Sequence, residues 1–576
     1  MQRVASTGDL DLEPEPIEVE AKRLKPPPKR PVSRRQLQRM VLVAALSVAC
    51  ALSCVAFVIS TSSSAPHARV VERAKSTLGI AGQASELSGE QAVTPAGTEA
   101  ETTKAATTEA ETTKAATTEA ETTEAETTEA ATTEAETTEF DAIKAEIERL
   151  QVSNRQREFA LTLSNIAQRT TAPRGVVIPL YDDIALLGLS NLIALRELGV
   201  DDLPVEIPHC GDLRPALQEL IASCEPRARV YDVCVDALGA VNELGAREPL
   251  FCDSAAQCHS RFRGFNIKVI AVLFSRFDEV MLMDADTLFF ESPAPLWGLP
   301  QVARTGTLFF HDRISTTDQF LAQRFANASD GRAVSYLHAY LSSFDPMPYQ
   351  SLATIPRARA TAPNTMPATP RVPPSDFLLA SHSWNLRSGH ELDSSLVLWS
   401  KVRQPRATAI LASFVSLNGA YMPPSYGDKE FYFIACELAE TEYVFSDFGV
   451  GALGTDLRGG VGKPDAVLCG PGVLHYLPVA SDSDSNSGSN TRGQMLYFNS
   501  DDILTLNVTG DELYRSVARP AAFYPGAFAD KGLPHECPFD ITALPLTADE
   551  KATITRRQEL HETQLTQQLT PVFCRL

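Results

Sequence analysis

The stretch that decides the fold runs from Glu279 to Phe290 and reads EVMLMDADTLFF. Four consecutive apolar residues, Val280 to Met283, lead directly into the motif Asp284-Ala-Asp286. An apolar run of this length, without alternating polar residues, is typical of a strand that is buried on both faces. Two carboxylates therefore leave a buried strand together at its carboxyl end.

The sequence around this strand alternates between strand and helix patterns. We expect strands at 175–181, 204–207 and 279–283, and helices at 184–198 and 265–277. This alternation predicts an α/β fold with a mostly parallel sheet and helices on its faces. In such folds ligands bind at the carboxyl ends of the strands, where the two aspartates lie.

The two aspartates also predict a particular chemistry. Ionised carboxylates this close together repel each other strongly in a partly dry site. A divalent cation removes that repulsion, and hard cations prefer carboxylate and phosphate oxygens. Asp284 and Asp286 therefore predict a Mn²⁺ or Mg²⁺ site that also holds a diphosphate. The alternative is a turn or capping sequence, but the apolar strand before the motif favours the metal site.

The front of the chain predicts a membrane anchor. Residues 40–60 contain no charge, Pro or Gly, and as a helix they would span about 30 Å. In the cytoplasmic tail, 1–39, the part from Lys22 to Arg39 carries eight Lys and Arg and no acid. Positive flanks stay cytosolic, so we expect an uncleaved type II anchor. The alternative is a cleaved signal peptide, whose apolar region is usually about 7–15 residues long.

Residues 61–139 form a predicted low-complexity stem. Within it, the unit TEAETTKAAT occurs at 98–107 and again at 108–117. The stretch 98–139 contains no Leu, Ile, Val or aromatic residue and cannot bury a core. A disordered spacer, an acidic helix and an O-glycosylated stalk are all possible. The Thr content and the repulsion between Glu residues favour the stalk.

The remaining chain is expected to divide into three parts. A neck helix covers 140–169, with coil as the alternative. The catalytic domain covers 170–546 and carries a Pro-rich insertion at 344–375. The C-terminal tail, 547–576, begins with a polar helical pattern.

Charge and cysteine content restrict the class of protein further. The net charge is −21, and much of it lies in the stem, where 98–139 carries two Lys and twelve Glu. So acidic a chain is not expected to bind nucleic acid. Nine of the 11 cysteines follow the predicted anchor. In an oxidising lumen some should pair, and the odd number leaves at least one thiol free or intermolecular.

Two further motifs bear on this location. No Cys-x-x-Cys motif occurs, so we expect no zinc site. The glycosylation sequons at Asn327 and Asn507 are compatible with a luminal domain.

Several blocks in a fixed order carry a resemblance to a known family. Phe265–Trp297 contains a helix, Ser-x-Phe-x-x-Val, an apolar strand, Asp-x-Asp and a Pro-containing segment. It resembles the fungal-type alpha-mannosyltransferases of glycosyltransferase family 71. Further blocks that look like those of the family lie at 175–178, 195–206, 306–313, 391–395, 427–430 and 469–475, so the resemblance covers about 170–500.

The resemblance implies a fold, a location and an activity. The fold is GT-A, and the protein is a single-pass type II protein of the Golgi membrane with a luminal catalytic domain. The activity is transfer of mannose from GDP-mannose to a glycan or glycoprotein acceptor with retention of configuration, as in an alpha-1,3- or alpha-1,2-mannosyltransferase. The leaving phosphate of a retaining enzyme can itself deprotonate the incoming hydroxyl, so we nominate no separate base.

The resemblance also implies catalytic and metal-binding residues. Asp284 and Asp286 would hold the metal and the donor diphosphate. His475 would be the third metal ligand, with a hydrogen-bonded histidine as the alternative. Asp428 and Glu430 are candidate catalytic residues, although acids are also favoured before a helix such as the one expected at 431–438.

Donor binding is implied for residues in several blocks: Gly175, Lys268, Asp393, Ser394 and Lys429. Lys268 lies in a predicted helix, so a solvated charge is its alternative role. Ser395 stands where the family has a glycine, which argues against close approach of a ligand to the backbone there.

Two other functions stay open at this point. An Asp-x-Asp motif cannot distinguish nucleotides, so a metal-dependent UDP-sugar transferase of the glycogenin type is one alternative. A catalytically inactive, mucin-like membrane-anchored protein is the other. The acceptor, the linkage and the oligomeric state do not follow from the sequence.

Overall fold

The computed structural model describes residues 152–242, 247–314, 319–326, 332–358, 360–361, 370–478, 493–505, 508–521 and 537–566. The predicted tail, anchor and stem lie outside these residues, as do both sequon asparagines and part of the Pro-rich insertion. Among the helices of the described residues, none is both long and apolar enough to cross a membrane.

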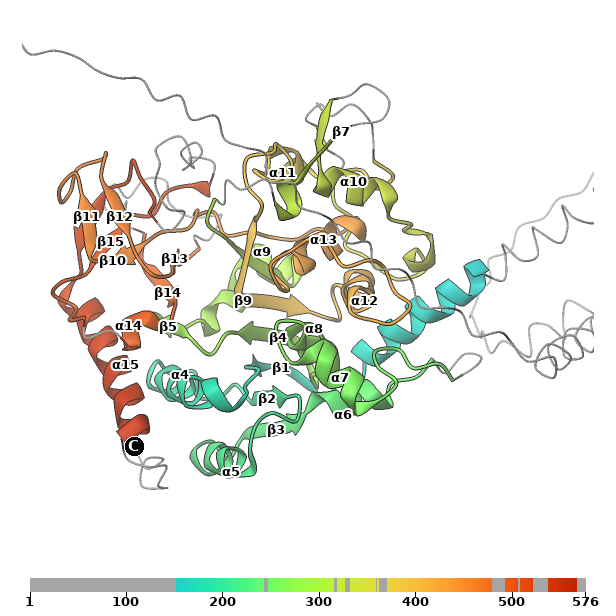
Figure 1. The fold of residues 1–576 in the computed structure, drawn as a ribbon, viewed down its shortest axis with the longest axis horizontal. Coiled ribbons are helices and arrows are strands. Elements are labelled where there is room, and N and C mark those ends of the chain that lie inside the picture. Colours follow the sequence, from blue (N-terminus) through green and yellow to red (C-terminus); the bar gives the residue numbers. More distant parts are fainter. Residues whose placement is uncertain are drawn as a thin grey trace, which may run out of the picture. The chain divides into compact units, whose positions relative to one another are not determined.

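The centre of the described chain is a six-stranded sheet in the order β3-β2-β1-β4-β9-β6 (Figure 1). The first four of these strands run parallel, and β9 is antiparallel to both of its neighbours. The bounds are β1 Ala172–Val177, β2 Val205–His209, β3 Ala228–Asp232, β4 Phe277–Met283, β6 Thr307–His311 and β9 Leu392–Ser400. The predicted α/β fold with a mostly parallel sheet is confirmed.

Two apolar cores lie on the two faces of this sheet. Successive side chains of a strand point to opposite faces, and β4 follows this rule. Val280 and Leu282 belong to one core, whereas Met281 and Met283 belong to the other. The strand is apolar throughout because both of its faces are covered.

Helices cover both faces. Those of one core include α6 Val233–Gly239, α7 Ala255–Phe262, α8 Ile267–Phe274, α12 Pro405–Phe414 and α13 Phe431–Leu438. Those of the other are α4 Ala185–Glu197, α5 Pro215–Cys224, α9 Pro300–Thr305, α14 Asp502–Thr505 and α15 Ala548–Thr566. The short helices α10 Tyr336–Ser343 and α11 Asp376–Ala380 contribute to the first core.

The structure changes several predicted boundaries. The helix expected at 265–277 ends at Phe274, and β4 begins at Phe277, two residues before the expected strand. Ser275 lies between them with extended backbone, and its hydroxyl accepts a hydrogen bond from the Phe277 N–H at 3.2 Å. The first strand also lies earlier than predicted, because β1 ends at Val177, before Pro179. Proline has no N–H to donate to a neighbouring strand.

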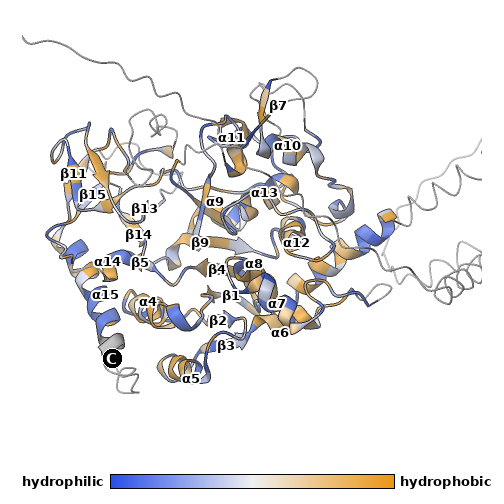
Figure 2. Ribbon diagram, viewed as in Figure 1, coloured by the Kyte–Doolittle hydropathy of each residue, from blue (hydrophilic) through white to orange (hydrophobic). Residues whose placement is uncertain are grey.

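Both ends of the described chain are attached to the domain. Residues 152–167 of the predicted neck are helical. Their buried side chains Ala160, Leu163 and Ile166 belong to the first core. Helix α15, which lies in the predicted tail, packs against α4 (Figure 1). Figure 2 shows a largely hydrophilic α15 beside a largely hydrophobic α4.

Smaller sheets complete the architecture. Their strands are β5 Thr287–Phe289, β7 Arg324–Ala326, β8 Ala333–Ser335, β10 Leu453–Gly454, β11 Asp456–Arg458, β12 Val467–Cys469, β13 Val473–Tyr476, β14 Met495–Asn499, β15 Tyr514–Ser516 and β16 Ala543–Pro545. The sheets are β13-β14-β5, β10-β15-β16, β11-β12 and β7-β8. Residues 284–286 thus connect β4 of the central sheet to β5 of a second sheet.

Cysteine pairing agrees with the sequence-based expectation. Disulfides join Cys210 to Cys234, Cys252 to Cys258, and Cys469 to Cys537. Within the described part of the chain, Cys436 is a buried free thiol.

Candidate active site

The backbone of the two-aspartate motif is held from several sides. The Asp284 N–H donates to the Ser395 carbonyl at 2.9 Å, which extends the pairing of β4 with β9. The Asp284 carbonyl accepts from the Thr287 hydroxyl at 2.9 Å and from the Asn191 amide at 3.3 Å. Asn191 also donates to the Thr287 hydroxyl at 2.7 Å. The motif is therefore fixed between the sheet and α4.

The motif borders a cavity of about 560 Å³ at the carboxyl ends of β1, β2 and β4. Its lining residues include Tyr181, Asp212, Arg263, Phe265, Lys268, Asp284, Asp286 and Asp501. Another cavity, of about 600 Å³, lies near the amino ends of β1, β3 and β4. None of the predicted site residues lines that second cavity, so the chemistry belongs to the first.

Lys268 is neither a solvated charge nor a free phosphate ligand. Its ammonium lies 2.6 Å from Asp284 Oδ1 and 3.6 Å from Asp428 Oδ1. It donates at 3.3 Å to the Ser394 carbonyl and hydroxyl. Burial alone would lower its pKa, but the two carboxylates raise it. Lys268 is thus the buried counterion of the motif.

The carboxylates of the motif retain excess negative charge despite Lys268. Burial raises the pKa of both, and for Asp286 burial together with the charge of Asp284 raises it to about 7. A divalent cation would relieve this cost, and two carboxylates suit a hard cation that takes its other ligands from a diphosphate and water. No cluster of three or more His, Cys, Asp or Glu suited to a metal is found among the described residues.

His475 lies in a separate cluster. Its Nε2 is 2.8 Å from Asp393 Oδ2. The Ser395 hydroxyl donates to the same oxygen at 2.5 Å, and it lies 3.1 Å from the Tyr497 hydroxyl, from which it can accept a hydrogen bond. Burial alone would raise the pKa of Asp393, but the hydrogen bond and charge of His475 hold it well below its usual value. His475 thus has a carboxylate partner, and metal ligation by it stays a prediction.

The Ser395 hydroxyl is itself part of this cluster. A glycine at position 395 would remove both of its hydrogen bonds. The difference from the family pattern is therefore accommodated by a local hydrogen-bond network around Asp393.

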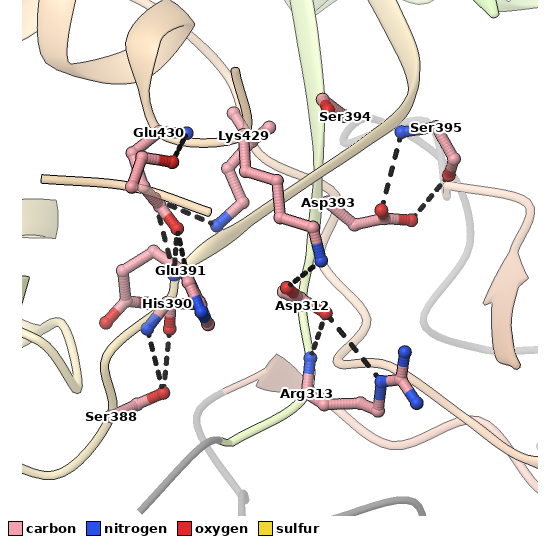
Figure 3. Close-up of polar contacts among 12 residues, drawn as sticks. Asp312, Arg313, Ser388, His390, Glu391, Asp393, Ser394, Ser395, Lys429 and Glu430 are labelled. Carbon is pink, nitrogen blue, oxygen red and sulfur yellow. Dashed lines mark hydrogen bonds and ion pairs between the residues drawn. The ribbon is translucent and has the colours of Figure 1, made fainter. Parts of the chain in front are cut away.

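The block 427–430 supplies three different contacts. Asp428 accepts from the Ser394 hydroxyl at 3.2 Å and from the Tyr432 hydroxyl at 3.0 Å. Lys429 extends to Asp312, with 2.6 Å between Nζ and Oδ2 (Figure 3). Burial alone would lower the pKa of Lys429, whereas the Asp312 carboxylate raises it, and the net shift is upward.

Glu430 holds backbone rather than lining the cavity. Its carboxylate accepts from the Glu391 N–H at 3.2 Å and lies 3.1 Å from His390 Nδ1 (Figure 3). The side chain is fully buried, and burial raises its pKa. The expected catalytic contact of Glu430 therefore has no support from its position.

Gly175 has a packing role. A Cβ at this position would lie 2.2 Å from Cζ of the Phe277 ring. The glycine is needed so that the ring can cover β1, and Gly175 does not line the cavity.

The structure therefore sorts the predicted residues into groups. Asp284 and Asp286 line the cavity with Lys268, and Asp428 and Ser394 contact Lys268 from outside the lining. Asp393 and His475 form a second cluster, and Lys429 and Glu430 each extend to partners of their own.

Other cavity residues were missed by reasoning from the sequence. Tyr181 and Asp212 follow the carboxyl ends of β1 and β2, so strand order could have indicated them. Arg263 is held over the cavity by donating to the Cys210 carbonyl at 2.9 Å and the Gly211 carbonyl at 3.0 Å. Nothing in the local sequence distinguishes it from a surface arginine.

A second missed arginine comes from the C-terminal helix. Arg557 of α15 is fully buried and donates to the Leu187 carbonyl at 3.2 Å. It also reaches the Ala285 carbonyl, at the middle of the motif, at 3.5 Å. Burial lowers the pKa of Arg557 to about 9.

Comparison with known proteins gives a consistent family. Residues 173–476 match the family model Mannosyl_trans3, described as "Mannosyltransferase putative". Among curated relatives, the alpha-1,3-mannosyltransferase MNT2 of Saccharomyces cerevisiae is 29% identical over 151 residues, which cover 26% of this chain and 25% of the relative. The alpha-1,3-mannosyltransferase MNT3 of the same yeast is 24% identical over 276 residues, 48% of this chain and 39% of the relative. The matches thus span less than half of these relatives.

Among solved structures, the bifunctional glycosyltransferase WbbM is similar to 47% of this chain, over 39% of its own length. The identity is 14% and the TM-score is 0.26.

Proposed function

Because the chain belongs to this mannosyltransferase family, we propose that it transfers mannose from GDP-mannose to a hydroxyl group of a glycan, with retention of configuration. The names of the yeast relatives support an alpha-1,3 linkage. The observation that carries the proposal is the position of Asp284 and Asp286. Both border a cavity of about 560 Å³ at the carboxyl ends of parallel strands, where ligands of α/β folds bind.

We assign the α/β domain to the GT-A class on the same basis. The parallel order β3-β2-β1-β4 supports this assignment, together with an Asp-x-Asp motif directly after β4.

The chain's own residues prepare this site for an anionic donor. Lys268 keeps Asp284 in place at 2.6 Å, and Asn191 and Thr287 fix the backbone of the motif. Arg263 brings a positive charge to the cavity lining, opposite in sign to a diphosphate. A Mn²⁺ or Mg²⁺ ion held by the two aspartates would neutralise the diphosphate as it leaves.

We also propose that the protein is a type II Golgi membrane protein with a luminal catalytic domain. The disulfides support an oxidising compartment, because cytosolic proteins rarely keep such bonds. A protease-protection assay on intact microsomes tests the topology. A C-terminal tag should be protected until detergent is added, and digestion without detergent would refute the orientation.

Activity is tested with the full chain purified in detergent, Mn²⁺, a panel of sugar nucleotides and alpha-linked oligomannosides. We expect transfer from GDP-mannose and from no other sugar nucleotide of the panel. Transfer from a UDP-sugar instead would favour the glycogenin-type alternative. No transfer from any donor, together with no donor binding, would favour the inactive protein.

A matched pair of double variants identifies the site. Asp284→Asn with Asp286→Asn should abolish transfer, because the amides no longer provide the charge that binds the cation. Asp201→Asn with Asp202→Asn removes two exposed, adjacent carboxylates outside the cavity and should leave transfer unchanged. Equal loss in both double variants would refute the assignment.

A further inference from the structure

Exposed aromatic rings lie at the edge of the cavity and on the loop that precedes α13. Among the described residues, five aromatic side chains are at least one-third exposed: Tyr181, Phe265, Phe325, Tyr421 and Tyr426. Tyr181 and Phe265 line the cavity beside the two aspartates. Tyr421 and Tyr426 lie on the loop between α12 and α13, directly before Gly427 and Asp428. Exposed aromatic rings that cluster in this way mark binding surfaces.

Phe265 connects the cavity to that loop. Its ring is 51% exposed, and its centroid lies 5.5 Å from that of Tyr426, which is 56% exposed. A Cβ at Gly427 would lie 2.6 Å from the Phe265 ring, and the backbone there has φ +71°. Only glycine tolerates both the positive φ and the close approach of the Phe265 ring. The loop backbone therefore lies directly against Phe265.

The pair Phe265–Tyr426 is held close to the reacting groups. Phe265 precedes Lys268 by three residues, and Lys268 contacts Asp284. On the other side, Tyr426 precedes Asp428 by two residues, and Asp428 lies 3.6 Å from the same ammonium. One aromatic pair thus flanks the buried lysine that supports the motif.

We infer that Phe265 and Tyr426 form the platform on which the acceptor glycan stacks. A pyranose ring presents one face of C–H groups, which packs on an exposed aromatic ring while its hydroxyls stay in water. The rings extend from the cavity edge onto a loop that carries a further ring, Tyr421, at 91% exposure. An extended series of separate rings suits a chain of sugars better than one compact nucleotide.

Polar groups around Tyr421 agree with a sugar ligand. Tyr421 lines a small cavity of about 190 Å³ together with Gln156, Asp345 and Asn418. Amide and carboxylate groups next to aromatic rings can hydrogen-bond sugar hydroxyls. The loop is also anchored, because the Leu417 N–H donates to the Leu250 carbonyl at 2.7 Å. We place the outer sugars of the acceptor here.

The inference rests on the proposed mannosyltransferase function, so the experiment separates the two. Binding of alpha-linked mannotetraose to the full chain is measured by saturation-transfer NMR and calorimetry, without donor. Transfer kinetics are measured in parallel with GDP-mannose and Mn²⁺. If the wild type binds the oligosaccharide but transfers nothing, the proposed function fails and the platform stands.

Tyr426→Ala should raise the KM or Kd for mannotetraose about tenfold and leave the KM for GDP-mannose within about twofold. Phe265→Leu, which keeps an apolar side chain at this position but removes the ring, should also weaken oligosaccharide binding. Phe325→Ala removes an exposed ring on β7 that lines neither cavity and is the matched control. Circular dichroism confirms that each variant is folded.

Two results would overturn the inference. One is a KM and Kd for mannotetraose that are unchanged in both Tyr426→Ala and Phe265→Leu. The other is a raised KM for GDP-mannose in Tyr426→Ala with normal oligosaccharide binding, which would make the rings a nucleotide platform. An equal effect of Phe325→Ala would likewise refute a specific site.

Discussion

Replacing Lys268 with methionine should destabilise the domain by about 3 kcal/mol. Removal of one partner from a buried ion pair costs about 3–5 kcal/mol, since the other charge stays buried and unpaired. Here the Asp284 side chain retains 26% of its accessibility, so water partly stabilises it after the change. Asp428 retains only 1% of its accessibility, but it keeps the hydrogen bonds that the Ser394 and Tyr432 hydroxyls donate to it. We therefore expect a value at the lower end of the range.

The measurement is equilibrium urea unfolding of the full chain in buffer free of divalent cations. Lys551→Met is the matched control, because Lys551 lies 2.7 Å from Asp511 in a similar ion pair at the surface. The side chains of this pair are 34% and 84% accessible, and exposed pairs contribute about 0–1 kcal/mol. The two variants thus differ mainly in burial.

The deficit should also depend on pH. Burial already raises the pKa of Asp284 above its usual value, and loss of the Lys268 charge raises it further. The folded variant therefore takes up a proton at a higher pH than the unfolded chain, which favours folding as the pH falls. The difference in the free energy of unfolding between Lys268→Met and the wild type should be largest above pH 7 and should decrease toward pH 5. A deficit below about 1 kcal/mol, or one equal to that of Lys551→Met, would refute the role of Lys268 as a buried counterion.

Three further changes have defined outcomes. Burial lowers the pKa of Lys401 to about 8, so the unfolded chain keeps the Lys401 proton to a higher pH than the folded chain. The free energy of unfolding of the wild type should therefore rise by about 2 kcal/mol between pH 7 and pH 10, relative to that of Lys401→Met. Urea titrations of both proteins at each pH measure this difference. Ser395→Gly removes a hydrogen bond to Asp393 and should cost about 1–2 kcal/mol in thermal unfolding; an unchanged Tm would contradict this. Arg557→Met removes a hydrogen-bond donor to the Ala285 carbonyl. A fluorescence titration should show about fivefold weaker binding of GDP-mannose. An unchanged affinity would leave Arg557 with a structural role only.

The central strand and its motif could be predicted from the sequence because their signal is local. An apolar run that is buried on both faces needs no partner to be recognised. Helix α13 was also predicted, at the bounds Phe431–Leu438, since charged residues precede a run of apolar ones. Strand β9, Leu392–Ser400, is not among the strands expected from the sequence. Its antiparallel insertion between β4 and β6 depends on pairing between segments that are far apart in the chain, such as Met283 with Leu396, which no local pattern encodes.

The side-chain partners in the site were harder to predict. Lys268 lies in the apolar helix IKVIAVLF, and a lysine in such a setting must be paired if it is buried. That rule predicts an acidic partner but not which one. Asp284 and Asp428 are brought to Lys268 by the sheet and by the loop before α13, so their identity follows from topology.

The contact between Arg557 and Ala285 links residues that are 272 positions apart in the chain. Chains emerge from the ribosome amino end first, and early segments begin to fold during synthesis. The strand that carries the aspartates is therefore synthesised well before α15 is available to support it. A nascent chain, or one shortened before α15, would carry an unsupported motif. The motif would then gain its full backbone support only when synthesis of the domain is finished.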